Sequence, residues 1–216
     1  MNKIFVKNNR EQIQNSVITN LNSVVIINTN ASPRTVGDAV QEYLEDKFVD
    51  CLPKDIVKEF STSFARRAMA DFAFTDIDGK YYVVDCKTHN LATAFNMPNL
   101  TSVERLARFY EDFNNYFAVL IIAYKFEDTK LLWTDCKFVP IELLDWSCLT
   151  IGALGWGQIQ IANSNNIVIN ENNTRKKWML ELCARLEQFY PNEIAKITKR
   201  IEHFKKIKEF WEEQAD

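Results

Sequence analysis

The chain has few of the residues that break regular structure or that build stapled and metal-bound domains. Five glycines and five prolines among 216 residues argue against a loop-dominated or disordered chain. The five cysteines are widely spaced and there are only two histidines, so a zinc site of Cys and His ligands is not expected. The longest strongly apolar run, residues 117–123, is too short to span a bilayer. These absences predict a globular protein without a membrane segment.

The remaining composition fits one folded domain. A hydrophobic content of 47% and a charged content of 25% predict a single domain over residues 1–216 with an ample core. The N-terminal residues Met1–Lys7 are followed by polar residues and do not form a signal peptide. Unpaired thiols suit a reducing compartment. We therefore expect a cytoplasmic protein.

Charge is unevenly distributed along the chain. The formal net charge is −3, which does not indicate nucleic-acid binding. Residues 175–211, however, hold ten Lys or Arg and five Glu, a local net charge of +5. This segment is either a phosphate-facing region or the solvated face of a helix.

Hydrophobic periodicity predicts alternating helices and strands. Helices are expected at residues 10–23, 35–51, 101–115 and 141–144, and after Thr174 with a break near Pro191. The residues expected to point inward are Val40, Tyr43, Leu44 and Phe48 in the second of these helices and Val103, Leu106, Ala107 and Tyr110 in the third. Strands are expected at residues 24–27, 71–87 as a hairpin, 116–124, 130–134 and 138–139, with a loop at 88–100. The pattern predicts an α/β (α+β) fold.

The hairpin at residues 71–87 carries the strongest chemical signal. Asp71 and Asp85 lie near its open end, and Lys87 follows Asp85 by two, so Asp85 and Lys87 share one face of a strand. A two-residue turn would direct Asp85 away from Asp71. A three-residue loop, residues 77–79, places Asp71 opposite Asp85, and Gly79 occupies the position that favours a left-handed residue. We expect this loop, or a bulge with the same effect. Two acids and an ammonium at one spot suit a divalent cation beside a phosphate.

Residues 152–174 are rich in glycine and asparagine around Gln158–Ile161. They are either two β segments with asparagine turns or a base-reading segment, since carboxamides bond bidentately to adenine.

These segments resemble the PD-(D/E)xK nucleases, and among them the type II restriction endonucleases of the EcoRV and HincII group. The similar stretches are Ala70–Ala73, Val84–Asn90, the loop Ala94–Asn99, Gln158–Ile161 and Asn173–Trp178, within residues 34–210. Ala70 stands where the motif's name has proline. The resemblance implies a restriction-endonuclease-like mixed central β-sheet flanked by helices.

The resemblance also implies roles for individual residues. Asp71, Asp85 and the Cys86 carbonyl would bind Mg²⁺, for which Mn²⁺ can substitute, and Lys87 would orient or help deprotonate water. An auxiliary helix acid would be Glu42, with Gln41 as the alternative. The expected DNA-binding residues are Thr88, His89, Asn90, Phe95, Asn96, Gln158, Gln160, Asn163, Asn165 and Arg175. Further candidate phosphate contacts are Arg34, Arg66 and Arg67.

The implied activity is Mg²⁺-dependent, sequence-specific cleavage of double-stranded DNA, with a blunt cut in a palindromic site, in a bacterial or archaeal cytoplasm. A palindromic target would be met by a homodimer, for which residues 1–33 are the expected contact, while residues 152–174 are the expected recognition segment. The alternatives are a repair or recombination nuclease of the same fold and a non-catalytic DNA-binding protein.

Overall fold

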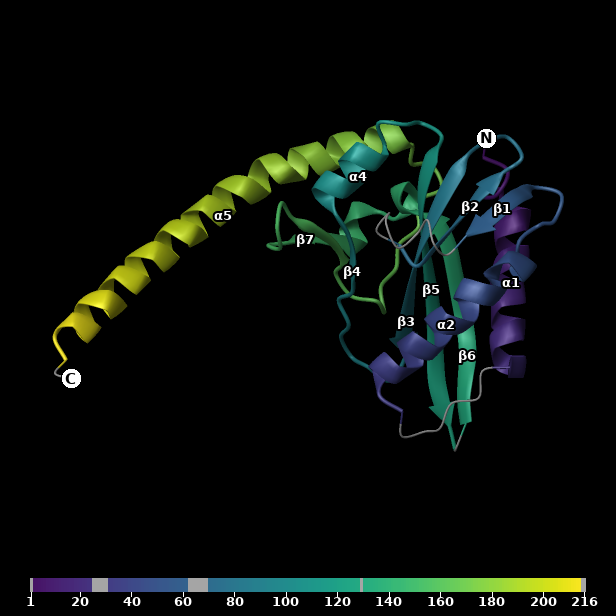
Figure 1. Ribbon diagram of the computed structural model, residues 1–216, viewed down its shortest axis with the longest axis horizontal. Helices are drawn as coiled ribbons and strands as arrows, with labels where there is room; N and C mark the ends of the chain where they lie inside the picture. Colours follow the sequence, from purple (N-terminus) through teal and green to yellow (C-terminus); the bar gives the residue numbers. More distant parts are fainter. Residues whose placement is uncertain (1, 25–30, 62–69, 129, 215–216) are drawn as a thin grey trace. The chain divides into compact units, whose positions relative to one another are not determined.

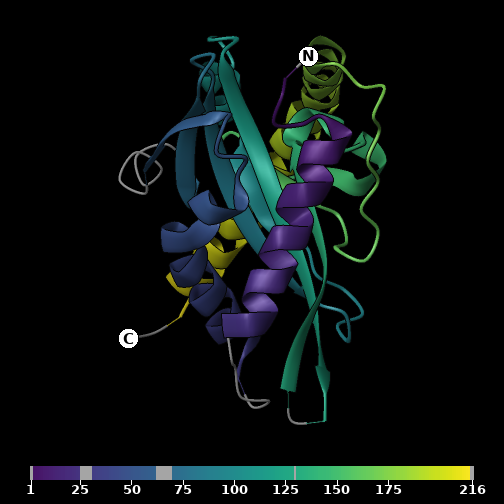
Figure 2. The same ribbon diagram turned by 90° about the vertical axis from the view of Figure 1, so that its right-hand side faces the viewer.

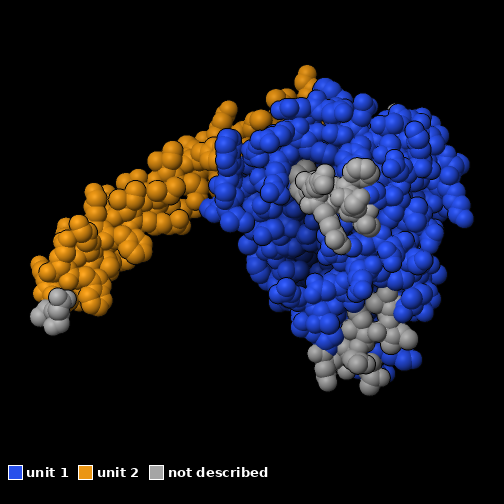
Figure 3. All heavy atoms as spheres, viewed as in Figure 1, with its two compact units in different colours: residues 1–172 blue, residues 173–216 orange. Residues whose placement is uncertain are grey.

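The computed structural model describes residues 2–24, 31–61, 70–128 and 130–214. Within them the chain forms two compact units, residues 1–172 and residues 173–216 (Figure 3). Length and composition predict a single domain over residues 1–216, whereas in the structure residues 173–216 form a separate unit that consists of one helix. Residues 25–27 of the strand expected at 24–27, together with Arg66 and Arg67, lie outside the described residues, and Val24 is helical rather than extended.

The larger unit is built on a mixed five-stranded sheet (Figure 1). Its strands are β1 (Val57–Ser61), β2 (Phe72–Asp76), β3 (Tyr81–Asn90), β5 (Asn115–Glu127) and β6 (Lys130–Pro140), in the order β1-β2-β3-β5-β6. β3 and β5 run parallel and the other neighbours run antiparallel. The chain is thus a mixed α+β protein with a mixed central sheet flanked by helices, as the sequence predicts.

Helices α1 (Lys7–Val24) and α2 (Pro33–Cys51) cover one face of this sheet (Figures 1 and 2). Each buries a stripe at helical spacing. The buried apolar residues are Ile13, Val17 and Leu21 on α1 and Val36, Val40, Leu44 and Phe48 on α2. Ser32 caps α2 through the Thr35 N–H, and the Phe48 ring packs 4.6 Å from that of Phe72. The face of β3 that carries Tyr82 and Val84 therefore forms the main core.

The opposite side of the sheet carries a second, smaller sheet (Figure 1). Its strands are β4 (Asn99–Ser102), β8 (Gln158–Ile161) and β7 (Leu149–Gly152), in the order β4-β8-β7. The short helix α4 (Val103–Phe109) and the 3-10 turns η1 (Ile141–Leu143) and η2 (Trp146–Cys148) complete this layer. Val83 and Val119 are fully buried beneath it, so the centre of the large sheet is covered on both sides.

The predicted three-residue hairpin loop is confirmed. Thr75 pairs with Tyr81, Asp76 N–H donates to the Lys80 carbonyl, and residues 77–79 form the loop. Gly79 has φ +77°, the left-handed conformation that glycine adopts without strain.

Several element boundaries differ from the sequence prediction. The helix expected at 101–115 is only Val103–Phe109, because Asn99–Ser102 pairs as strand β4, and Ala107 is exposed. The two strand segments expected after residue 130 are one strand, β6. The loop expected at 88–100 begins only after Asn90, where β3 ends.

Unit 2 is a single helix, α5 (Arg175–Glu212). Thr174 caps it through the Lys177 N–H, as predicted, but the predicted break near Pro191 is wrong, since the helix continues through that residue. No helix in the described ranges combines the length and apolarity that a bilayer span requires.

Candidate functional site

The β2–β3 hairpin brings two carboxylates and an ammonium together. Phe72 lies opposite Val84, where the pairing of β2 and β3 ends, and the Asp71 N–H donates to the Val84 carbonyl at 2.9 Å, so the predicted pairing of Asp71 with Asp85 stays a prediction. Asp71 Oδ2 accepts from the Cys86 N–H at 2.6 Å, and Lys87 Nζ donates to Asp85 Oδ1 at 2.8 Å. Three side chains that the sequence selected therefore meet at one place.

Asp85 is the most constrained of these groups. It is 5% exposed, and its Oδ2 atom finds no hydrogen-bond donor in the described part of the chain. Burial, opposed by Lys87 and reinforced by the charge of Asp71, raises the pKa of Asp85 to about 7. A buried carboxylate oxygen without a donor is costly, and a bound cation would remove that cost.

The neighbouring groups respond to the same burial. Burial raises the pKa of Asp71, although the Cys86 N–H and Lys87 oppose the rise. For Lys87, burial lowers the pKa but the charge and hydrogen bond of Asp85 outweigh it, so the net pKa is raised. Lys87 is therefore an ammonium at neutral pH and acts as a cation rather than as a base in this state.

A third carboxylate acts on the site from α2. The charge of Glu45 raises the pKa of Asp71, and the Glu45 carboxylate accepts from Gln41 Nε2 at 3.0 Å. Gly37, Gln41 and Glu45 are four residues apart and share a stripe of the helix. A Cβ on Gly37 would lie 3.4 Å from Thr88 Oγ1, which places this stripe on the β3 side.

The expected auxiliary acid, Glu42, lies on the exposed side of α2. The alternative, Gln41, belongs to the stripe that faces β3, but the acid of that stripe is Glu45, which the sequence interpretation missed. The repeat of Gly37, Gln41 and Glu45 was visible in the sequence. Only the close approach of Gly37 to Thr88 shows which stripe faces the strand.

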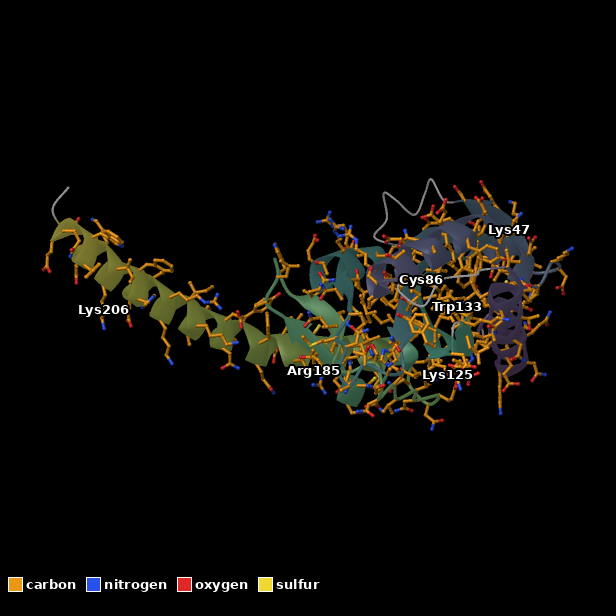
Figure 4. The ribbon with its side chains drawn as sticks, turned by 90° about the horizontal axis from the view of Figure 1, so that it is seen from below. Lys47, Cys86, Lys125, Trp133, Arg185 and Lys206 are labelled. Carbon is orange, nitrogen blue, oxygen red and sulfur yellow. The ribbon has the colours of Figure 1, made fainter. Side chains whose placement is uncertain are left out.

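The residues present fit a hard cation in part. Asp71 and Asp85 offer carboxylate oxygens, which suit Mg²⁺ because it takes one or two carboxylates and keeps several waters. In the described ranges, no group of three or more His, Cys, Asp or Glu side chains forms a complete metal shell. The Cys86 side chain packs against the main core, within the body of unit 1 (Figure 4), and its N–H donates to Asp71.

The small sheet presents a row of amides. Gln158 and Gln160 are partly exposed on β8, whereas Ile159 and Ile161 on its other face are buried. Gln160 lies opposite Asn99 and donates to Asn99 Oδ1 at 2.5 Å. A Cβ on Gly152 would lie 2.5 Å from Gln160 Oε1, so the absence of a side chain at residue 152 makes room for this amide.

Other expected DNA-binding residues are engaged within the chain. His89 is 3% exposed and its Nε2 lies 2.8 Å from Asn165 Oδ1. The Asn165 amide donates to the Thr93 and Ala94 carbonyls, and Asn163 Oδ1 accepts from the Asn165 N–H. His89, Asn163 and Asn165 therefore hold the loop after β3 in place, and their expected contacts with DNA stay a prediction.

The remaining expected contacts divide by position. Asn90 Oδ1 accepts from the Ala92 N–H and shapes a turn, while Thr88 approaches α2. Phe95 is 60% exposed, and Asn96 holds the loop by accepting from the Ser164 N–H through its carbonyl. Arg175 begins α5 in unit 2.

A scan against models of known protein families finds no match, and no curated protein matches the sequence significantly.

Proposed function

We propose that this chain is a divalent-metal-dependent endonuclease that cleaves double-stranded DNA at specific sequences. The observation that carries the proposal is the buried Asp85 carboxylate, paired with Lys87 on one oxygen and without a donor on the other among the described residues. With the charge of Asp71 acting on Asp85, this arrangement is suited to a cation and a phosphate. The mixed sheet agrees with the restriction-endonuclease-like fold that the sequence resemblance implies.

The residues have separable tasks. Asp71 and Asp85 would hold Mg²⁺, which when bound polarises a phosphate and lowers the pKa of bound water. The Lys87 ammonium, kept charged by Asp85, orients the attacking water and offsets charge that develops on the phosphate. Glu45 adds a third negative charge near Asp71 and takes the auxiliary role expected of Glu42. The Cys86 carbonyl as a further ligand stays a prediction.

Recognition is assigned to the small sheet. The Gln160 amide is held by its hydrogen bond to Asn99 and occupies the space left because residue 152 has no side chain. An amide held in this way can bind a base edge with little loss of conformational entropy. The exposed Phe95 is suited to inserting between base pairs from the minor groove. These features favour sequence-specific cutting over the structure-specific cutting of a repair nuclease. A cytoplasmic homodimer remains part of the proposal.

Digestion of one long DNA with and without Mg²⁺ tests the proposal. Discrete bands that require Mg²⁺ or Mn²⁺ are the expected result. A smear, or cutting confined to branched or flapped substrates, would indicate a repair or recombination nuclease instead. Tight DNA binding with no product under either metal would leave a non-catalytic DNA-binding protein and would contradict the proposed chemistry.

A further inference from the structure

Helix α5 carries a long row of exposed apolar side chains. Starting at Leu180, positions spaced alternately by three and four residues run to Trp211. Seven of these positions are large and apolar, and between 37% and 67% of each is exposed: Leu180, Tyr190, Ile194, Ile197, Ile201, Phe204 and Trp211. Alternating steps of three and four are the heptad spacing of coiled coils.

Two further exposed apolar residues of α5, Ile207 and Phe210, lie outside this row. The buried residues of α5, Trp178 and Leu182, lie on the opposite side of the helix from Leu180. The other three positions of the row are Cys183, Glu187 and Lys208, so the apolar row is interrupted by two charged residues of opposite sign. The seven apolar positions nevertheless keep the spacing of a helix-pairing seam.

We propose that α5 pairs with α5 of a second copy of this chain as an antiparallel coiled coil. The central layer would place Ile194 against the partner's Ile197. Moving outward, Tyr190 would meet the partner's Ile201, and Leu180 would meet the partner's Trp211. Pairing in this register uses nearly the whole length of the helix, Arg175–Glu212.

Charge decides the orientation. A parallel, in-register pair would place Arg200 beside the partner's Lys205 and Lys208 beside its own copy, and both contacts are repulsive. In the antiparallel pair, Glu193 lies beside the partner's Arg200, and Lys177 lies beside the partner's Glu212. Each attractive contact occurs twice because of the two-fold symmetry. Glu193 is bonded to Lys196 on its own helix at 2.7 Å, so the partner's Arg200 adds a second cation there.

The area is sufficient for a specific dimer. The exposed parts of the seven apolar side chains amount to on the order of 700 Å² per helix, close to the roughly 800 Å² per partner of standard interfaces. The apolar face of α1 is buried within its own chain. The seam on α5 therefore offers a better dimer surface than the expected contact at residues 1–33.

The mass of the full chain in solution tests the pairing, independently of any DNA cleavage. Light scattering on the eluting protein is expected to give twice the chain mass of 25.2 kDa. Ile194→Glu with Ile197→Glu is expected to give the single-chain mass with an unchanged circular dichroism spectrum. Asn192→Glu with Ala195→Glu adds the same charge away from the seam and should remain dimeric. A monomeric wild type, or a dimer that survives the first pair of substitutions, would overturn the proposal.

Disulfide trapping tests the orientation in a Cys183→Ser background, since Cys183 is the exposed thiol. A mixture of Tyr190→Cys and Ile201→Cys chains should cross-link, whereas each variant alone should not, because like positions would lie about 16 Å apart along the helix. Cross-linking of each variant with itself would overturn the antiparallel arrangement. Glu193→Arg should weaken the dimer, and adding Arg200→Glu should restore it; failure of that rescue would count against the charge pairing.

Discussion

At the residue scale, Asp85 is the most informative position, because a carboxylate oxygen is buried there without a donor among the described residues. Lys87 donates a hydrogen bond to only one of the two Asp85 carboxylate oxygens, Oδ1. The two acids and the lysine were found from sequence because their spacing follows strand geometry. Glu45 was missed because its position depends on which side of α2 faces β3, a property of tertiary packing.

We predict that metal-free stability falls as pH rises. Burial raises the pKa of Asp85 to about 7, whereas an unfolded aspartate titrates at about 3.9. The folded state therefore favours the protonated carboxyl, and this stabilisation is lost as pH rises through about 7. Between pH 5 and pH 8, the unfolding free energy of the wild type should fall by about 2–3 kcal/mol more than that of Asp85→Asn. Urea denaturation of both proteins in the presence of a metal chelator measures this difference.

Added Mg²⁺ should reverse this loss. Its stabilising effect on the wild type should be larger at pH 8 than at pH 5, because the ion requires an ionised carboxylate. Asp85→Asn should show little effect of Mg²⁺ at either pH. The same pH slope in both proteins would mean that Asp85 does not titrate as its burial implies.

Glu45 and Glu42 provide a matched pair on one helix. Glu45→Gln removes a charge that acts on Asp71, so it should lower the cleavage rate at limiting Mg²⁺ by roughly tenfold or more, a typical cost of losing an outer-shell metal partner. Glu42→Gln removes an exposed charge of the same kind and should leave the rate within about twofold of wild type. Cleavage rates across a Mg²⁺ titration check this, and the opposite ranking would restore Glu42 to the auxiliary role.

At the element scale, the three-residue loop of the β2–β3 hairpin was predicted to the residue, whereas β3 extends to Asn90 and the bounds of α4 were not predicted. The hairpin is a local structure, because its loop length, its glycine and its alternating pattern lie within a few residues of each other. The segment 99–102 became β4 because it pairs with Gln158–Gln160, more than fifty positions later in the chain. No local pattern distinguishes that strand from the first turn of a longer helix.

Gly79→Ala should destabilise the hairpin through its backbone alone. A Cβ at residue 79 would contact nothing within 4 Å, but φ is +77°, a conformation that costs other residues about 1–2 kcal/mol. The unfolding free energy should fall by about that amount, measured by urea denaturation. Gly79→Asn should lose less, because asparagine tolerates this conformation. Equal losses for alanine and asparagine would place the cost elsewhere.

At the scale of the whole molecule, hydrophobic periodicity predicted the fold class, and the family resemblance implied the mixed central sheet, whereas composition predicted one domain. It did not separate residues 173–216, because a single helix without a core of its own has no distinctive composition. The heptad row on α5 was present in the sequence, yet it was masked by the ten cations that suggested a phosphate-facing segment. The exposure of these apolar side chains in the structure is what makes the row apparent.

Cleavage by Lys87→Ala is the most direct test of the catalytic site. Wild type, Lys87→Ala and Lys125→Ala should be compared on one long DNA with Mg²⁺, and DNA binding should be measured on the same preparations. Lys125 pairs with Glu127 on β5 and controls for loss of a surface cation. Lys87→Ala should cut at least ~1000-fold more slowly and bind DNA nearly as well as wild type, while Lys125→Ala should give the wild-type bands. Full cleavage by Lys87→Ala would contradict the site at Asp71, Asp85 and Lys87.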